Sequence, residues 1–379
     1  MRHALALALL AGCSCGGPEA PVAGAPSSRA PDTEAPDPEA PDTAAADYEV
    51  HEWGLLRATA DDALSAGAIG PPRAVTPITV DKPVLYFHTS APFVLRRAEV
   101  DTRGGRIVEA WPPARSSDPS RLVWTDVRID PSGACAPSPL PTLRDPACTR
   151  LGPGEVCEVA ALAIVRTDEA ACVRTAEHTD SMLFYRERTR GLTPPLRFER
   201  TSTYEVVEVT NEGTSAIPGW LVRLHDDGTS VRALAVRPPA PGQRITVGAD
   251  FAAATVPRAD DEVAQDRAAV DGPALPGSPE PGRAAIRATV RELGLTEAEA
   301  DAFLRAWDPT LFAVTTDGRF GAIDVLTADG DPAPRESFLY FLPEADCERV
   351  SHLTLDPPPR AIRRALALWS PLRASGASR

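Results

Sequence analysis

Apolar residues along this chain fall into short runs, which predict β-strands more often than helices. The segment 83–88 reads Pro-Val-Leu-Tyr-Phe-His and is continuously apolar at its centre, as a strand buried on both faces is. The segment 122–129 alternates between aliphatic or threonine residues and bulkier or charged ones, which is typical of a half-buried strand. Further strands are expected over 48–54, 93–100, 106–111, 159–165, 181–185, 204–209, 220–224, 231–236, 322–326 and 338–342.

Turn signals between these runs favour antiparallel pairing. Arg103-Gly104-Gly105 separates two strand-like segments and predicts a hairpin between 93–100 and 106–111. Between 204 and 236, short glycine-containing turns separate the apolar runs and predict an antiparallel meander. Because these turns are short, consecutive strands are expected to lie side by side.

A late segment, residues 283–308, has helical periodicity instead. Apolar residues recur at i, i+4 and i+7 from Ile286, and Gly294 stands where a helix C′ residue belongs. Thr296 and Glu299 then form a Thr-x-x-Glu capping box at the start of a second helix. We therefore predict a mainly β fold of the α+β class, with an antiparallel, sandwich-like body and a late helical hairpin.

The first twelve residues have the pattern of a secretion signal. Arg2 is positive, Ala4 to Leu10 is apolar, and this run is shorter than the ~20 residues that a bilayer span requires. The Leu-Ala-Gly before Cys13 resembles the processing site of bacterial lipoproteins. That resemblance implies cleavage before Cys13, a lipid on its thiol and anchoring in the cell envelope. An ordinary signal peptide cut elsewhere is the alternative.

Residues 13–47 are expected to be a linker between the membrane and a β-rich body over 48–373. Ala-Pro-Asp recurs at positions 30, 35 and 40, and the prolines favour an extended chain. The stretch has no aliphatic stripe that could form a core. A second acidic segment rich in proline and glycine, residues 256–282, is expected to be a mobile loop within the body.

Composition excludes several functions. The formal net charge is −14, and Lys82 is the only lysine among 39 basic residues. A phosphate-binding loop of the Gly-Lys-Ser/Thr type is therefore impossible. The acidic balance and the export signal argue against nucleic acid as a partner.

Cysteine placement predicts disulfides in the body. Region 131–175 is rich in proline and glycine and is expected to be a stapled loop, since exported thiols tend to pair. The sequence does not fix the connectivity, and the simplest arrangement pairs Cys135 with Cys148 and Cys157 with Cys172, with Cys347 left free or paired with Cys15. No Cys-x-x-Cys exists, so we expect no zinc site and no cofactor. The four candidate cysteines are Cys135, Cys148, Cys157 and Cys172.

The sharpest polar pair is His51-Glu52, which could serve as a base with its orienting carboxylate or as two metal ligands. Adjacent side chains of a strand point to opposite faces, so both could serve one site only at a bend, for which Gly54 is a candidate. His88 ends a buried strand and could meet them. A catalytic site of His51, Glu52 and His88 is therefore one hypothesis, and a structural histidine beside Trp53 is the alternative.

Several blocks resemble a group of exported bacterial proteins. These proteins open with Val-His-Glu-Trp-Gly, as residues 50–54 do, and carry a Pro-Val-Leu-Tyr-Phe strand soon after, as residues 83–87 do. Residues 182–186, 339–343 and 356–359 follow in the same order. The resemblance spans nearly the whole body and implies one structural unit, but it implies no activity and no catalytic residue.

These observations predict a lipid-anchored envelope protein with a non-catalytic binding or structural role, whose partner is an unidentified protein or polymer. The alternative is a lipid-anchored hydrolase of envelope or extracellular polymers, with its site near His51, Glu52 and His88. The sequence does not decide between them, so whether the chain is an enzyme stays open.

Overall fold

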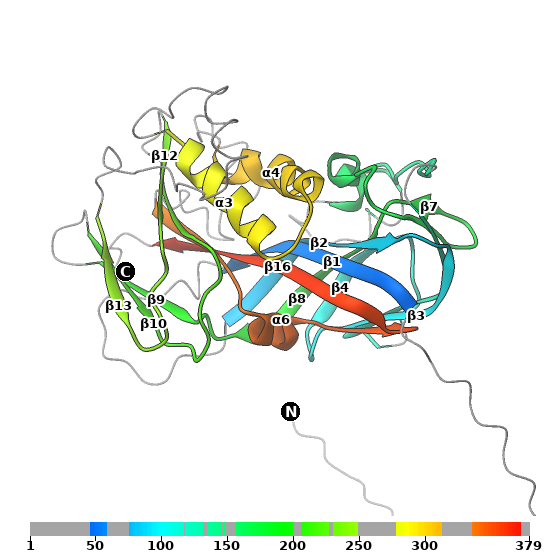
Figure 1. Ribbon diagram of the computed structural model, residues 1–379, viewed down its shortest axis with the longest axis horizontal. Helices are drawn as coiled ribbons and strands as arrows, with labels where there is room; N and C mark the ends of the chain where they lie inside the picture. The colour runs from blue at the N-terminus through cyan, green and yellow to red at the C-terminus, as the bar shows by residue number, and fades with distance from the viewer. Residues whose placement is uncertain are drawn as a thin grey trace, which may run out of the picture. The chain divides into compact units, whose positions relative to one another are not determined.

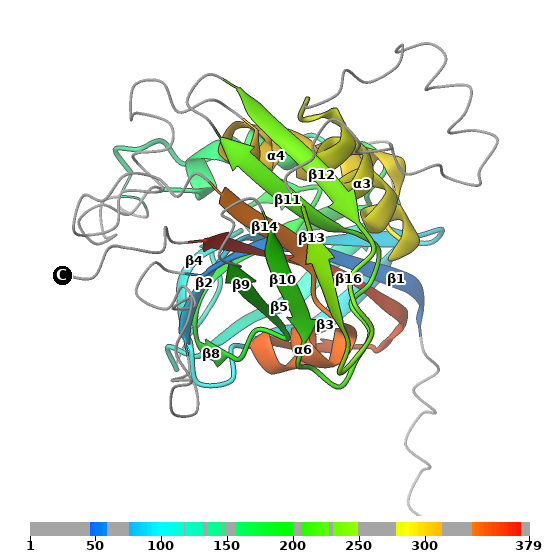
Figure 2. The ribbon, with the colours of Figure 1, turned by 90° about the vertical axis from the view of Figure 1, so that its left-hand side faces the viewer.

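In the part of the chain that is described, eight strands form one large sheet around β1 (Ala46–Ala58), as Figures 1 and 2 show. Neighbouring strands are antiparallel, except that β1 runs parallel to the C-terminal β16 (Pro359–Leu372). In spatial order the sheet is β12 (Val231–Val236), β11 (Leu221–Asp226), β14 (Glu336–Phe341), β16, β1, β2 (Thr76–Thr89), β8 (Leu183–Leu192) and β4 (Arg106–Trp111).

This computed structural model describes residues 46–58, 76–116, 118–131, 135–145, 148, 157–200, 206–226, 230–248, 278–312 and 336–372. The chain divides between Thr43 and Ala44, and every described residue belongs to the second unit. The predicted signal peptide, nearly all of the linker with Cys13 and Cys15, the strand expected at 322–326, and most of the loop expected at 256–282 lie outside the described residues.

Two smaller sheets pack against the large one. Val50 and Phe87 of the large sheet lie in one buried cluster with Leu95 and Trp124 of the five-stranded sheet. Phe198 of the three-stranded sheet stacks on Phe338 of the large sheet, with ring centroids 4.4 Å apart. The five-stranded sheet is β15 (His352–Asp356), β3 (Phe93–Asp101), β5 (Arg121–Asp130), β6 (Cys172–Arg174) and β7 (Thr179–Asp180), and the three-stranded sheet is β13 (Arg244–Val247), β10 (Val207–Asn211) and β9 (Leu196–Arg200).

Helices α3 (Glu280–Glu292) and α4 (Glu297–Leu311) cover one side of the large sheet, and the short helix α6 (Glu344–Val350) lies on the other (Figure 1). Phe303 of α4 packs edge-on against Trp53 of β1, with ring centroids 5.4 Å apart. Gly294 ends the first helix with φ +91°. The predicted mainly β fold with a late helical hairpin is confirmed. None of the described helices is both long enough and apolar enough to cross a bilayer.

The predicted strand at 159–165 is wrong, because this segment forms a 3₁₀ helix, η2 (Val159–Val165). Its buried residues recur every third position, which suits the three residues per turn of this helix. The carboxylate of Glu109 also accepts hydrogen bonds from the backbone amides of Glu158 and Val159, at 3.1 and 3.4 Å. A buried carboxylate at the start of the segment therefore satisfies amides that a helical turn leaves free.

The hairpin predicted around Gly104 is also wrong. Strands β3 and β4 flank a turn in which the amide of Gly105 donates to Thr102, but they belong to different sheets. The ten-residue strand β5 offers β3 a longer antiparallel partner than the six-residue β4 does, while β4 pairs with β8. The turn is thus a corner between two layers.

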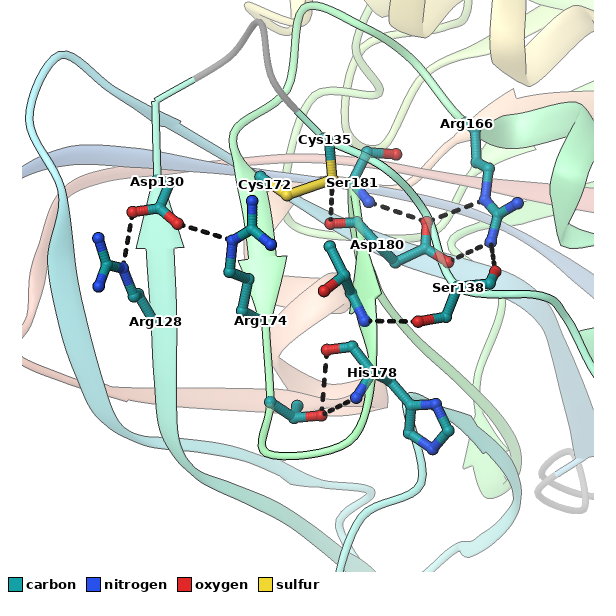
Figure 3. Close-up of a disulfide and its surroundings, with 12 residues drawn as sticks. Arg128, Asp130, Cys135, Ser138, Arg166, Cys172, Arg174, His178, Asp180 and Ser181 are labelled. Carbon is teal, nitrogen blue, oxygen red and sulfur yellow. Dashed lines mark hydrogen bonds and ion pairs between the residues drawn. A yellow bond between two sulfur atoms is a disulfide. The ribbon is translucent and has the colours of Figure 1, made fainter.

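The four predicted disulfide cysteines do form disulfides, but the predicted pairing of Cys135 with Cys148 and of Cys157 with Cys172 is wrong. The bonds join Cys135 to Cys172 and Cys148 to Cys157. Figure 3 shows the Cys135–Cys172 disulfide with Ser138 nearby. The amide of Ser138 donates to the Thr179 carbonyl, and the amide of Thr179 donates to Ser138 Oγ. These bonds hold the loop along β7, beside β6, so the first cysteine meets the fourth.

Candidate metal centre

Strand alternation places His51 and Glu52, the adjacent pair that the sequence suggested as a site, on opposite faces of the sheet. His51 and Trp53 face helices α3 and α4, whereas Glu52 points to the opposite side of the sheet. Pairing with β2 changes register only after Trp53, beyond both residues. The bend that would bring His51 and Glu52 into one site is therefore absent from this described stretch, and the predicted set His51, Glu52, His88 is wrong in its carboxylate.

The structure instead brings His51, His88 and Glu299 together, from β1, β2 and α4. His51 Nδ1 lies 2.8 Å from Glu299 Oε2, and His88 Nε2 lies 2.9 Å from Glu299 Oε1. The two imidazole rings are 4.2 Å apart between centroids. One ligand atom from each residue falls within 4.8 Å of the others.

Antiparallel register places the two histidines. Tyr86 lies opposite His51, so His88, two residues further along β2, is the diagonal neighbour of His51 on the same face. His51 is buried, with 6% of its side chain exposed, whereas 22% of the His88 side chain is exposed. The site therefore opens to solvent on the His88 side.

The helix cap places Glu299. Its backbone amide donates to Thr296 Oγ1 at 3.2 Å, and its carboxylate accepts from the Thr296 amide at 2.7 Å. The carboxylate itself is completely buried. Burial by itself would raise the pKa of Glu299, but hydrogen bonds from His51 and His88 outweigh it and lower the pKa to about 2. The carboxylate is therefore ionised and is held at the first turn of α4, where negative charge is favourable.

Glu49 faces the second nitrogen of His51. Its Oε2 lies 3.6 Å from His51 Nε2, an ion-pair distance that is longer than a hydrogen bond. The side chain of Arg360 holds Glu49, with Nη2 2.9 Å from Oε1, and this contact, against partial burial, lowers the pKa of Glu49. A carboxylate behind a histidine in this way leaves the other ring nitrogen available to a metal.

Glu52 belongs to a buried network on the far face of the sheet. Arg364 donates through Nε to its carboxylate and through Nη2 to Ser351 Oγ. Tyr185 donates its hydroxyl hydrogen to Glu52 at 2.6 Å. All of these groups are buried, so Glu52 is a structural ion-pair partner and not part of the His51 site.

Two imidazoles and one carboxylate are the ligand set of catalytic zinc centres such as His₂Glu sites. A tetrahedral ion with bonds of about 2.0–2.1 Å separates its ligand atoms by about 3.3 Å. His51 and His88 lie against different oxygens of Glu299, at 2.8 and 2.9 Å, and one ligand atom from each residue lies within 4.8 Å of the others. Binding of an ion would lengthen the nitrogen–oxygen separation by about half an ångström and shorten the longest separation by up to about 1.5 Å. The three side chains therefore offer the ligand set of a divalent transition metal.

Cys347 and the histidines His178 and His352 lie outside this group. Cys347 is buried and free, and burial raises the pKa of its thiol to about 12. His178 packs against Trp111 with the two rings tilted by 48° and their centroids 4.8 Å apart. His352 bonds Glu348 through Nδ1 at 2.6 Å, and no third metal-binding group joins this pair among the described residues.

Neither a known protein family nor a curated protein matches this chain. The site must therefore be argued from its own chemistry. Sequence reasoning recognised Glu299 only as a capping residue, because a capping box explains a glutamate at this position completely. No sequence spacing connects Glu299 with His51, which lies 248 positions away.

Proposed function

We propose that this protein is a lipid-anchored envelope protein whose folded body binds a divalent transition metal through His51, His88 and Glu299. Zinc is the first candidate, because it accepts imidazole and carboxylate ligands in a tetrahedral site. The observation that carries the proposal is the convergence of these three side chains from separate elements. A binding role agrees with the sequence-based expectation, but the proposed metal departs from the expectation of no zinc site and no cofactor.

Three features of the site favour a metal over a hydrogen-bonded cluster alone. The Glu299 carboxylate is ionised in a fully buried position, so it offers a full negative charge to a cation. Glu49 stands behind His51 as outer-shell carboxylates stand behind metal-binding histidines. His88 is partly exposed, which provides a path for an ion to enter.

The test is metal titration of the full-length protein, purified in detergent and freed of metal with a chelator. We expect one zinc or cobalt ion per chain. His88→Ala and Glu299→Gln should each weaken binding by more than the 10- to 100-fold that is typical of outer-shell changes. Glu49→Gln should weaken it within that 10- to 100-fold range.

Two variants control for loss of structure. His352→Ala removes an imidazole that also bonds a glutamate but lies in a pair without a third ligand, so metal binding should not change. Thr296→Ala removes the hydroxyl of the capping box but keeps all three ligands. Absence of stoichiometric binding by the unaltered protein, or equal binding by Glu299→Gln, would reject the metal site.

Anchoring and family membership are parts of the same proposal that rest on sequence alone. Cys13 is the expected lipid attachment point, and replacing it with serine should move the protein from the membrane fraction to the soluble fraction. The resemblance to exported proteins that open with Val-His-Glu-Trp-Gly supports export and one structural unit.

A hydrolase of envelope polymers is the second candidate function, and one observation favours it. Three protein ligands leave a fourth position for water, which a zinc ion activates at neutral pH. In this version Glu299 replaces Glu52 in the predicted site. Release of soluble fragments from peptidoglycan or envelope polysaccharide by the zinc-loaded protein, lost in His88→Ala, would support this function.

A further inference from the structure

We propose that the metal centre binds a small oxyanion, of the carboxylate or phosphate type, and that Arg363 positions this ligand beside the metal. The inference rests on the metal site proposed above and names the class of ligand that the site takes. The place of Arg363 in the fold is fixed by strand pairing, and its guanidinium makes no hydrogen bond or ion pair with the described residues.

Arg363 lies next to His51 on the same face of the sheet. The two residues are partners in the parallel pair β1–β16, and adjacent strands lie about 4.8 Å apart. The following residue, Arg364, bonds Glu52 on the opposite face, so alternation directs Arg363 towards α3 and α4. The backbone of the sheet therefore places Arg363 beside His51 on the β16 side, across β1 from His88.

The turn between α3 and α4 holds the arginine stem. The Arg363 Cδ lies 3.2 Å from the point that a Cβ would occupy on Gly294. Since Gly294 has φ +91° and no side chain, the arginine can pass close over the turn that leads to Glu299. The methylene groups of Arg363 are therefore packed against the turn, although Arg363 as a whole is an exposed residue.

The guanidinium of Arg363 is free to take a ligand. Arg360 forms the direct ion pair with Glu49, and Arg363 acts on Glu49 only through its field. Within the residues that the structure describes, Arg363 makes no hydrogen bond or ion pair. It therefore has its planar set of donors available to solvent beside the turn at Gly294.

Charge at the loaded site favours an anion. A divalent ion with two neutral imidazoles and the Glu299 carboxylate leaves one positive charge, and Arg363 adds another. Arg360 pairs with both Glu49 and Asp47, so these three groups contribute one negative charge, and the loaded site with Arg363 keeps one net positive charge. An oxyanion can bind the fourth metal position with one oxygen and the guanidinium fork with another, whereas a neutral ligand or a halide cannot match the fork.

The experiment uses the full-length protein loaded with cobalt(II), whose visible absorption reports on its coordination. Acetate and inorganic phosphate are the probes, and chloride at equal ionic strength is the reference. We expect both oxyanions, but not chloride, to change the cobalt bands in a saturable way. Arg363→Gln should keep its cobalt and weaken acetate binding about tenfold or more, because it loses a charge-assisted pair of hydrogen bonds.

Arg96→Gln is the matched control, since Arg96 is an exposed arginine of the five-stranded sheet that pairs with Asp356. It should bind the probes as the unaltered protein does. Cobalt bands that ignore both oxyanions, that respond equally to chloride, or that respond equally in Arg363→Gln would overturn the inference and leave the metal site standing. Failure to bind cobalt at all would remove the proposed function and the inference with it.

Discussion

Glu187 should make the protein less stable as the pH rises, and replacing it with glutamine should remove this effect. The residue lies in β8 and is completely buried. Neither of its carboxylate oxygens has a hydrogen-bond partner among the described residues. Burial, together with the nearby charges of Glu52 and Asp101 and against that of Arg364, raises the pKa of Glu187 well above 4.5. The folded protein therefore favours the neutral form of this carboxyl group more strongly than the unfolded chain does.

The sign follows from proton binding. Above pH 4.5 the unfolded chain releases the proton while the folded chain keeps it, so stability falls as the pH rises until the folded-state pKa is reached. For one group the slope is about 1.4 kcal/mol per pH unit. Glu187→Gln has no proton to release, so over two pH units its advantage over the unaltered protein should grow by about 3 kcal/mol.

The assay is urea unfolding of both proteins at pH 5, 6 and 7. Comparison of the two cancels the titration of other groups. Glu344→Gln, which changes an exposed glutamate on α6, is the control and should keep the slope of the unaltered protein. The reasoning would be refuted if the difference in stability between Glu187→Gln and the unaltered protein stayed constant from pH 5 to 7. Such a result would mean that Glu187 is already ionised in the folded protein.

Three further changes test the fold. Arg364→Met should reduce the free energy of unfolding by about 3–5 kcal/mol, because it leaves Glu52 charged and buried without its partner. Urea unfolding measures this change, and an unchanged free energy of unfolding would contradict the buried ion pair. Gly294→Ala should cost roughly 1–2 kcal/mol by thermal unfolding, because alanine is strained at φ +91°, and unchanged stability would argue against that backbone conformation. Removing the Cys135–Cys172 disulfide should destabilise the protein about 1 kcal/mol more than removing the Cys148–Cys157 disulfide, because the first closes a loop of 37 positions and the second a loop of 9. Equal unfolding midpoints of the two variants would contradict this dependence on loop length.

The sequence was informative where one local interaction decides the structure. The periodicity of 283–308, a glycine after the first helix and a Thr-x-x-Glu box before the second fix the helical hairpin within a few residues. Local sequence signals gave a wrong prediction where a residue far away in the chain supplies the hydrogen bonds of a segment. The segment 159–165 has strand-like composition, but Glu109 from β4 caps its amides and makes it helical.

The candidate site divides in the same way. Strand alternation, readable in the sequence, already opposed a joint role for His51 and Glu52, and the structure places them on opposite faces. That His88 could meet His51 was also expected from its position at a strand end. The sequence gives no sign that Glu299 completes the set, because its helix could have packed against the sheet in many registers.

By itself, then, the sequence determined the strand-rich class, the helical pair, the four cysteines that form disulfides and the side of β1 on which each residue faces. These features depend on periodicities and contacts over a few positions. The tertiary structure alone decided which cysteines pair, which carboxylate joins the histidines and that Arg363 stands beside them. Such choices depend on how β1, β16 and α4 dock, and docking is set by the packing of buried side chains that are far apart in the chain.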